Sequence, residues 1–440
     1  MLPIDKSITN DTIKRLGIVD LRSATIRQIC ALANQLEQHS GEQFSHLEIG
    51  NPGLPPATIG MQSERDAITE GIVNRYPNIA GIPEIKSAGS SFVKAFLDLD
   101  IDSKGIIPTV GSMQGTFTLM LLLKKRTEGK ETMLFIHPGF PAQSNQAKIL
   151  GMNTRSFDIY EYRGEKLRVK LEEMLAPGDV CGIIYSNPNN PAWTNFTDDE
   201  LKIIGEMATK YDVIVLEDLA YMGMDFRKGY GIPYKTPYIP SVGKYTDNYI
   251  LLISASKIFS YAGQRIAIVC ISDKVYNSFS ESIADFYEFP CFGDAYVYGV
   301  LYASSSGTAH SAQYAMASMM KAACEGRINF VADCSEYARR AKRVREIFLK
   351  NGFHLVYSDD MNDPISDGFF FTAGYGNLKS EILQLELLRY GIATISLPCT
   401  GSTQDGVRVC ISVISDENEF SILDERLKRF DDDHKFDKSS

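Results

Sequence analysis

The feature of this sequence that most restricts its fold is a lysine placed between two short, strongly apolar runs. The runs are Tyr249–Ile253 and Ile266–Ile271, and Lys257 lies in the segment that joins them. Short apolar runs rich in β-branched residues are typical of buried strands in an α/β sheet. Burying an ammonium group is costly unless it is paired or neutralised. Burial and the nearby Arg265 would lower the pKa of Lys257, as an amine nucleophile requires, although a lysine here can also extend its head group to solvent.

Short apolar runs of this kind recur along the chain up to about residue 275, and predicted helical segments separate them. Ligands of open α/β sheets bind beyond the carboxyl ends of the strands. The residues predicted at or just after those ends are Ser112, Phe140, Asn190, Asp218 and Lys257. Together they supply the groups that would hold a planar, phosphorylated, nitrogen-containing ring. Simpler interpretations remain open for two of them, with Phe140 as packing and Asn190 as a turn residue.

A glycine turn follows the first predicted strand of this series. The strand is Ile106–Val110, the turn is Gly111–Gly115, and an apolar helix is predicted over Thr116–Lys125. Such a turn presents free backbone N–H groups and the positive end of a helix dipole to a phosphate, although many similar turns bind nothing. No G-x-G-x-x-G follows a strand and no G-x-x-x-x-G-K-[ST] occurs, so nothing in the sequence supports a nicotinamide or ATP site.

The composition argues against several classes of partner. The net charge is −10 and the sequence contains no long Lys/Arg stripe, which makes nucleic acid and anionic membranes unexpected partners. The amino terminus lacks an apolar signal core, and no stretch approaches a membrane span. The eight cysteines form no C-x-x-C pair, which favours a reducing compartment over a disulfide framework or a zinc site. We therefore expect a cytoplasmic protein without a bound metal.

The last third of the chain has a different pattern. A mainly helical stretch carries the basic segment Arg339–Arg343, which we interpret as a solvated helix face, and strands are predicted at Phe369–Thr372 and Val407–Ile411. In the second strand Arg408 lies on the face opposite the valines. It could bind a carboxylate with both nitrogens of its fork, or be an ordinary exposed strand residue. Residues 431–440 are predicted to be a frayed tail.

Four ordered motifs carry a resemblance to a known family. They are Asn-Pro-x-Asn-Pro, Asp-x-x-Tyr, Ser-x-Ser-Lys and an arginine eight residues after the lysine. In this chain they are Asn187–Pro191, Asp218–Tyr221, Ser254–Lys257 and Arg265. With these motifs the chain resembles the fold-type-I pyridoxal-phosphate (PLP) enzymes of the class I/II aminotransferase family, from about Leu47 to Ile414.

The resemblance implies an α/β fold with a large domain, whose mostly parallel seven-stranded sheet lies between helices, and a smaller α+β domain. The expected boundaries are 1–52 for an amino-terminal arm that joins the small domain, 53–325 for the large PLP-binding domain, and 326–440 for the small domain. It also implies PLP as cofactor, an amino acid and a 2-oxo acid as substrates, and a homodimer with shared active sites.

The resemblance also assigns roles to single residues. Lys257 would form a Schiff base with the cofactor aldehyde and later move the proton between the substrate Cα and the cofactor. Asp218 would pair with the pyridinium nitrogen, so that the ring can accept electrons. Tyr221 and Asn190 would hydrogen-bond the phenolate oxygen of the ring, and Arg408 would bind the α-carboxylate of the substrate. The other implied positions are Ser112, Met113, Ser254 and Arg265 at the phosphate, Phe140 against the ring, Tyr76 from the neighbouring subunit at the phosphate, and Gly50 beside the substrate.

Two departures from the family pattern concern the substrate. The usual Asn-Pro-Thr-Gly continuation is replaced by Asn190-Pro-Ala-Trp193, which either reshapes the pocket or only packs against the domain. No arginine occurs between Arg265 and Arg327, where dicarboxylate-specific relatives carry a second carboxylate clamp. This argues against aspartate or glutamate as the preferred donor, although a clamp from the arm (Arg22 or Arg27) stays open.

The leading hypothesis is an aminotransferase that moves an amino group from an amino acid to a 2-oxo acid. A carbon–sulfur β-lyase, or another carbanion-forming PLP enzyme, would share Lys257, Asp218, Tyr221 and Arg265, so the motifs do not separate these activities. A non-catalytic effector domain on the same fold is disfavoured, because every catalytic position is filled.

Overall fold

The central sheet of the protein consists of seven short strands in the order β2-β8-β7-β6-β5-β3-β4. The structure is a computed structural model and describes residues 2–361 and 363–435. The strands are β2 (Ile106–Val110), β3 (Thr132–His137), β4 (Asn153–Asp158), β5 (Val180–Ser186), β6 (Ile214–Asp218), β7 (Tyr249–Ser254) and β8 (Ile266–Ile271). All neighbouring pairs are parallel except the two that involve β8, so the predicted mostly parallel seven-stranded sheet is confirmed.

The reversed strand β8 determines where Lys257 lies. Ser254 at the end of β7 pairs with Ala267 at the start of β8, so the chain turns back at the carboxyl end of β7. The short helix α9 (Ala255–Ile258) lies in this turn and carries Lys257. The parallel strands β5 and β6 end at the same edge of the sheet, which brings their terminal residues to the neighbourhood of the lysine.

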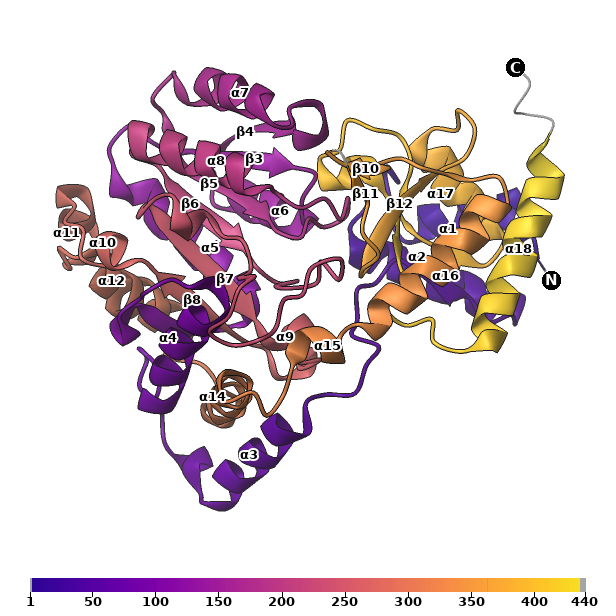
Figure 1. Cartoon of the computed structure of the whole chain (residues 1–440). Coiled ribbons are helices and arrows are strands. Elements are labelled where there is room, and N and C mark those ends of the chain that lie inside the picture. The colour runs from indigo at the N-terminus through magenta and orange to yellow at the C-terminus, as the bar shows by residue number, and fades with distance from the viewer. Residues whose placement is uncertain (1, 362, 436–440) are drawn as a thin grey trace.

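Both faces of this sheet are covered by helices (Figure 1). Along β7 the side chains alternate, with Leu251 and Ile253 in one apolar core and Ile250 and Leu252 in another. A strand buried on both faces must be apolar throughout, which explains the continuous apolar runs of the sequence. The longer covering helices are α4 (Pro83–Leu97), α5 (Gly111–Arg126), α6 (Pro141–Ile149), α7 (Glu165–Leu175), α8 (Asp198–Tyr211) and α14 (His310–Cys324).

A smaller unit is built on a four-stranded antiparallel sheet in the order β14-β15-β12-β9. Its strands are β9 (His354–Leu355), β12 (Phe370–Gly374), β14 (Ile395–Ser396) and β15 (Val407–Cys410), and its helices are α16 (Glu336–Lys350), α17 (Ser380–Arg389) and α18 (Glu417–His434). The amino-terminal helices α1 (Lys6–Arg15) and α2 (Ile26–Ser40) pack with this unit (Figure 1). The arm joins it through β1 (Ser45–His46), which pairs with β13 (Ile392–Ala393).

Further α-helices and strands belong to the described chain. They are α3 (Thr58–Thr69), α10 (Asp273–Tyr276), α11 (Glu281–Tyr287), α12 (Phe292–Asp294), α13 (Tyr302–Ser305), α15 (Phe330–Asp333), β10 (Asp359–Asp360) and β11 (Asp363–Pro364). No helix in residues 2–361 and 363–435 has both the length and the apolar character that crossing a membrane requires.

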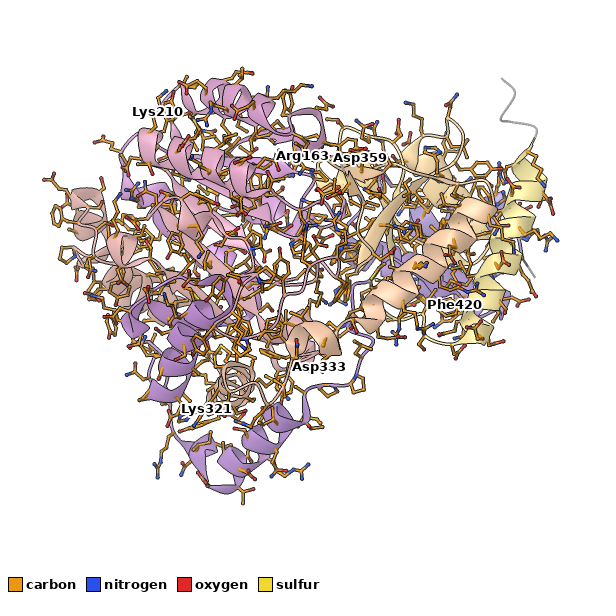
Figure 2. All side chains as sticks on the ribbon, in the orientation of Figure 1. Arg163, Lys210, Lys321, Asp333, Asp359 and Phe420 are labelled. Atoms are coloured by element: carbon orange, nitrogen blue, oxygen red, sulfur yellow. The ribbon has the colours of Figure 1, made fainter. Side chains whose placement is uncertain are left out.

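A buried carboxylate of the small unit fastens the β10–β11 hairpin to the large unit. Asp360 accepts hydrogen bonds from Arg163 Nη1 at 3.0 Å, from Arg227 Nη2 at 2.8 Å and from the backbone N–H of Asn195 at 3.1 Å. Figure 2 labels Arg163 and the adjacent Asp359 where the two units meet. The two arginines keep further partners, Glu200 and Asp225. Charge-assisted bonds of this kind hold the small unit beside the loop that contains Asn190.

Three local expectations differ from the structure. The helix α5 begins at Gly111 rather than Thr116, so the predicted glycine turn is the first turn of the helix itself. Arg340 is buried and not solvated as expected. Its side chain faces the segment that contains Ser412, and its Nη1 donates to the Ser412 carbonyl. Residues 431–434 are helical, and Tyr375 Oη donates to Asp431, while residues 436–440 lie outside the described chain.

Candidate active site

Lys257 lies in α9, immediately after β7. Ser254 caps this helix by accepting a hydrogen bond from the backbone N–H of Ser256 at 3.2 Å. The Lys257 ammonium donates to the carbonyl of Gly50 and lies 5.1 Å from the ring centre of Phe369. Burial lowers the pKa of Lys257 to about 8, with smaller contributions from Arg408 and Arg265. A larger share of neutral amine near neutral pH is what a nucleophilic lysine needs.

Asp218 ends β6, and its carboxylate is almost fully buried. Its Oδ2 accepts from Gln143 Nε2 at 2.8 Å, and its Oδ1 accepts from the backbone N–H of Ala220 at 3.1 Å. Burial raises the pKa of Asp218 to about 6. A protonated ring nitrogen would offset this cost, because an opposite charge favours the ionised carboxylate.

Gln143 was not predicted from the sequence. It lies in the first turn of α6, which follows the carboxyl end of β3 (His137), the kind of position at which ligand-binding residues occur. Its amide nitrogen fixes the direction of the Asp218 carboxylate. The only signal for it in the sequence was this position, because a glutamine at a helix start has no motif of its own.

A cradle for an anion lies at the start of α5. Gly111 has a φ of +66°, a backbone conformation that favours glycine, and the Arg265 guanidinium lies directly against it, with Nη2 2.6 Å from where a Cβ atom would stand. Ser112 and Met113 occupy the first turn of this helix, whose free backbone N–H groups and dipole favour an anion. The residues present therefore fit the phosphate of PLP, the cofactor that the resemblance implies.

The loop after β5 is held against the end of β6 by its asparagines. The backbone N–H of Asn187 donates to the carbonyl of Asp218 at 3.2 Å, and that of Asn190 donates to Ser186 Oγ at 3.1 Å. Asn189 Nδ2 donates to the carbonyl of Pro138 at 2.7 Å. Asn190 is thus more than a turn residue, because its side chain is buried and directed to the small unit.

Arg408 comes from β15 of the small unit and is 1% exposed, so the interpretation as an exposed strand residue is wrong. Its Nη1 donates to Asn190 Oδ1 at 3.4 Å, its Nη2 donates to the carbonyl of Glu48, and its guanidinium lies 4.7 Å from the ring centre of Phe370. Its Nε has no partner in the described chain. A buried guanidinium held only by neutral acceptors is suited to receive a carboxylate.

An aromatic cluster joins the two units beside these groups. Tyr221 contacts Phe369 and Phe370 at ring-centre distances of 5.4 Å, and Trp193 meets Tyr221 at 5.3 Å and Phe370 at 6.1 Å. A Cβ atom on Gly368 would overlap the Trp193 indole. Trp193 therefore packs at the junction, in a space that a glycine provides.

The remaining predicted residues lie at different distances from this arrangement. Gly50 lies next to Lys257, because its carbonyl accepts the hydrogen bond from the ammonium group. A Cβ atom on Gly50 would contact the ring of Phe370 at 3.4 Å. Phe140 is half-buried at the start of α6, next to the turn that carries Gln143. Tyr76 is not brought into the site of its own chain, because its side chain is 92% exposed.

Comparison with known proteins places the chain in a family. The model of the family described as "Aminotransferase class I and II" matches residues 44–419. A probable aspartate aminotransferase of Methanocaldococcus jannaschii is 25% identical over 256 residues, which are 58% of this chain and 62% of that protein. An S-alkyl-thiohydroximate lyase of Arabidopsis thaliana is 24% identical over 230 residues, 51% of this chain and 47% of the lyase.

A solved structure supports the same fold. A double mutant of the aspartate aminotransferase of Thermus thermophilus superposes with a TM-score of 0.73 at 17% identity, covering 92% of this chain and 96% of that one. At this identity the likeness concerns the fold alone. The family match extends over most of the chain, and the four motifs lie within it. The chain belongs to the class I and II aminotransferase family.

Proposed function

We propose that the protein is a PLP-dependent aminotransferase that moves an amino group from an amino acid to a 2-oxo acid. The family is PLP-dependent, and the cradle at α5, the buried Asp218 and the amine of Lys257 fit the phosphate, the ring nitrogen and the aldehyde of this cofactor. When bound, PLP supplies an electrophilic aldehyde carbon and a ring that accepts an electron pair.

One observation carries the proposal, namely the 3.4 Å contact between Arg408 Nη1 and Asn190 Oδ1. It brings the only guanidinium of β15 to the loop that is tied to Asp218. An α-amino acid presents a carboxylate and an amine on one carbon. A carboxylate bound by Arg408 would therefore hold the substrate Cα near Lys257.

Each residue has a task of its own in this proposal. Arg408 binds the α-carboxylate and orients the substrate. Lys257, partly neutral because its pKa is lowered to about 8, would move the proton between the substrate Cα and the bound cofactor. Asp218 holds the ring-nitrogen proton, directed by Gln143. The aromatic rings of Phe369 and Phe370 keep water from the reacting atoms.

The test is amino transfer by the purified protein loaded with PLP, given a panel of amino acids and one 2-oxo acid. We expect a new 2-oxo acid and a new amino acid in equal amounts, together with a change in the visible absorption of the bound cofactor. The Lys257→Arg variant, which keeps the positive charge, should lose this activity by about 10⁴-fold. Ammonia formed together with an oxo acid, in the absence of any acceptor, would establish a lyase instead.

Three properties extend this proposal. The proposed division of the chain at residues 52 and 325 is supported by the separate large and small sheets. A homodimer is supported by the apolar side chains of Val73 and Tyr76, which are 68% and 92% exposed. A cytoplasmic location is supported by the eight cysteines, all of which are free. Size-exclusion chromatography with light scattering tests the dimer.

A further inference from the structure

The segment Leu47–Asn51 lies between the arm and the small unit and supplies backbone carbonyls to the candidate site. The Glu48 carbonyl accepts from Arg408 Nη2, and the Gly50 carbonyl accepts from the Lys257 ammonium. The segment follows β1 and contains no helix or strand of its own. Its position therefore depends on the contacts that its side chains and its ends make.

A buried carboxylate inside this segment is held by a histidine of β1. Glu48 is 1% exposed, and its Oε1 accepts from His46 Nδ1 at 2.8 Å. The Cys30 thiol lies beside the same carboxylate, and burial followed by Glu48 raises the Cys30 pKa to about 12, so the thiol stays protonated and is only a weak donor. A buried carboxylate is costly unless a charged partner donates to it, and a protonated His46 is such a partner.

His46 lies between two carboxylates. Its Nε2 lies 3.4 Å from Glu37 Oε2 of α2, and Glu37 Oε1 accepts from the backbone N–H of Phe44 at 2.7 Å. The hydrogen bond to Glu48 is the largest cause that raises the pKa of His46, and burial opposes it. Only a protonated imidazole donates from both ring nitrogens, so this geometry favours the charged ring. The other titratable groups around it, from α2 and α18, are Arg27, Cys30, Glu419 and Arg426.

Glu48 connects this charge to the site. The Leu47 carbonyl accepts from the backbone N–H of Cys410 at 2.9 Å, which places the segment along β15. The next residue, Glu48, directs its side chain to His46 and its carbonyl to Arg408. If His46 lost its charge, Glu48 would have to take up a proton or leave its buried position. Either change would act on the carbonyl that orients the Arg408 guanidinium.

We propose that His46 and Glu48 form a positioning pair for the carboxylate clamp, in which the protonated imidazole holds Glu48 and the Glu48 backbone holds Arg408. The pair is complete below the pKa of His46 and is lost as the pH rises through it, so a carboxylate should bind more weakly at higher pH. The proposal rests on the aminotransferase function proposed above, because it takes Arg408 as the clamp, and adds two positioning residues to it.

The test measures binding at the clamp without turnover. Propionate is titrated by calorimetry into the full chain loaded with PLP, in a Lys257→Ala background that removes an amine which titrates near Arg408. We expect binding that Arg408→Met abolishes and that His46→Gln weakens by about 2–30-fold, the range for residues that act through a chain of contacts. PLP retention, measured by absorbance after gel filtration, should not change. His354→Gln, at an exposed histidine of β9, is the matched control and should leave the affinity unchanged.

A double variant and a pH series separate positioning from a general structural role. His46→Gln combined with Glu48→Gln should bind propionate no more weakly than the weaker single variant, because one residue acts through the other. Exchange of the imidazole C2 hydrogen, followed by peptide mass spectrometry, should give His46 a pKa above about 6.5 that falls in Glu48→Gln. The affinity for propionate should decrease as the pH rises through that pKa, and His46→Gln should lack this decrease.

Two outcomes contradict the positioning pair. One is strictly additive losses for the two substitutions, and the other is an affinity that His46→Gln leaves unchanged at every pH. Propionate binding that Arg408→Met does not weaken would remove the clamp, and with it both this pair and the observation that carries the proposed function. If binding depends on Arg408 and His46 but no amino acid is turned over, the aminotransferase proposal fails and the positioning pair stands.

Discussion

The two ends of the candidate site are built differently. At the ring end, Asp218 is the last residue of β6 and the segment carrying Lys257 follows the adjacent strand β7, and the partners of Asp218 belong to the same unit. At the clamp end, Arg408 belongs to the small unit and reaches Asn190 of the large one. The first geometry depends on one sheet, and the second on how two units dock. A change at the docking surface should therefore affect the clamp end and spare the ring end.

Among the changes that test this comparison, the largest effect is expected from Arg408→Lys, which acts on the clamp end. Lysine keeps the charge but loses the forked geometry, so kcat/KM for amino donors should fall by about 10²-fold or more, equivalent to about 2–5 kcal/mol. Retention of PLP, measured by absorbance after gel filtration, should stay unchanged. Loss of PLP would show that the two ends are not separable.

Asp360→Asn tests the docking itself. The substitution removes the buried carboxylate charge that pairs with Arg163 and Arg227. Each arginine keeps a second carboxylate partner, Glu200 or Asp225. The expected loss of stability is therefore at the low end for broken buried ion pairs, about 3 kcal/mol. KM for amino donors should rise, whereas PLP retention should not change. Asp363→Asn, at an exposed residue of the same hairpin, is the control and should have little effect on urea unfolding.

Gly368→Ala tests the aromatic part of the same junction. The added methyl group would overlap the Trp193 indole, and overpacking of this kind costs about 1–3 kcal/mol. Trp193→Phe provides space, so the double variant should recover part of the loss in thermal unfolding. Strictly additive losses would mean that the two residues do not share this space.

The smallest effect links the two ends. Burial and, to a smaller extent, Arg408 lower the pKa of the free Lys257 amine to about 8. In the PLP-free protein its reaction with an amine reagent should therefore accelerate as the pH rises through 8 and then level off. Lys94 is an internal reference, because its hydrogen bonds to Asp100 and Asp98 raise its pKa, so its reaction rate should level off only at higher pH. In Arg408→Met the midpoint for Lys257 should move upward, measured by peptide mass spectrometry. An unmoved midpoint would show that the ends are electrostatically independent.

The sequence predicts the ring end of the site better than the clamp end. Strand ends and contiguous motifs indicated Lys257, Asp218 and the seven-stranded sheet, because a parallel sheet requires apolar runs and brings their ends to one edge. The environment of Arg408 was left open, since burial of a strand face depends on what docks against it. Asp360 and Gln143 were not predicted, because each functions through a partner distant in the chain.

Trp193 also makes the junction observable by light. It is the single tryptophan of the chain, it is fully buried, and its neighbours come from both units. Fluorescence excited at the indole band therefore originates at one known position between the units. A shift of its emission to longer wavelength would report entry of water at that boundary, whether or not the remainder of the molecule has changed.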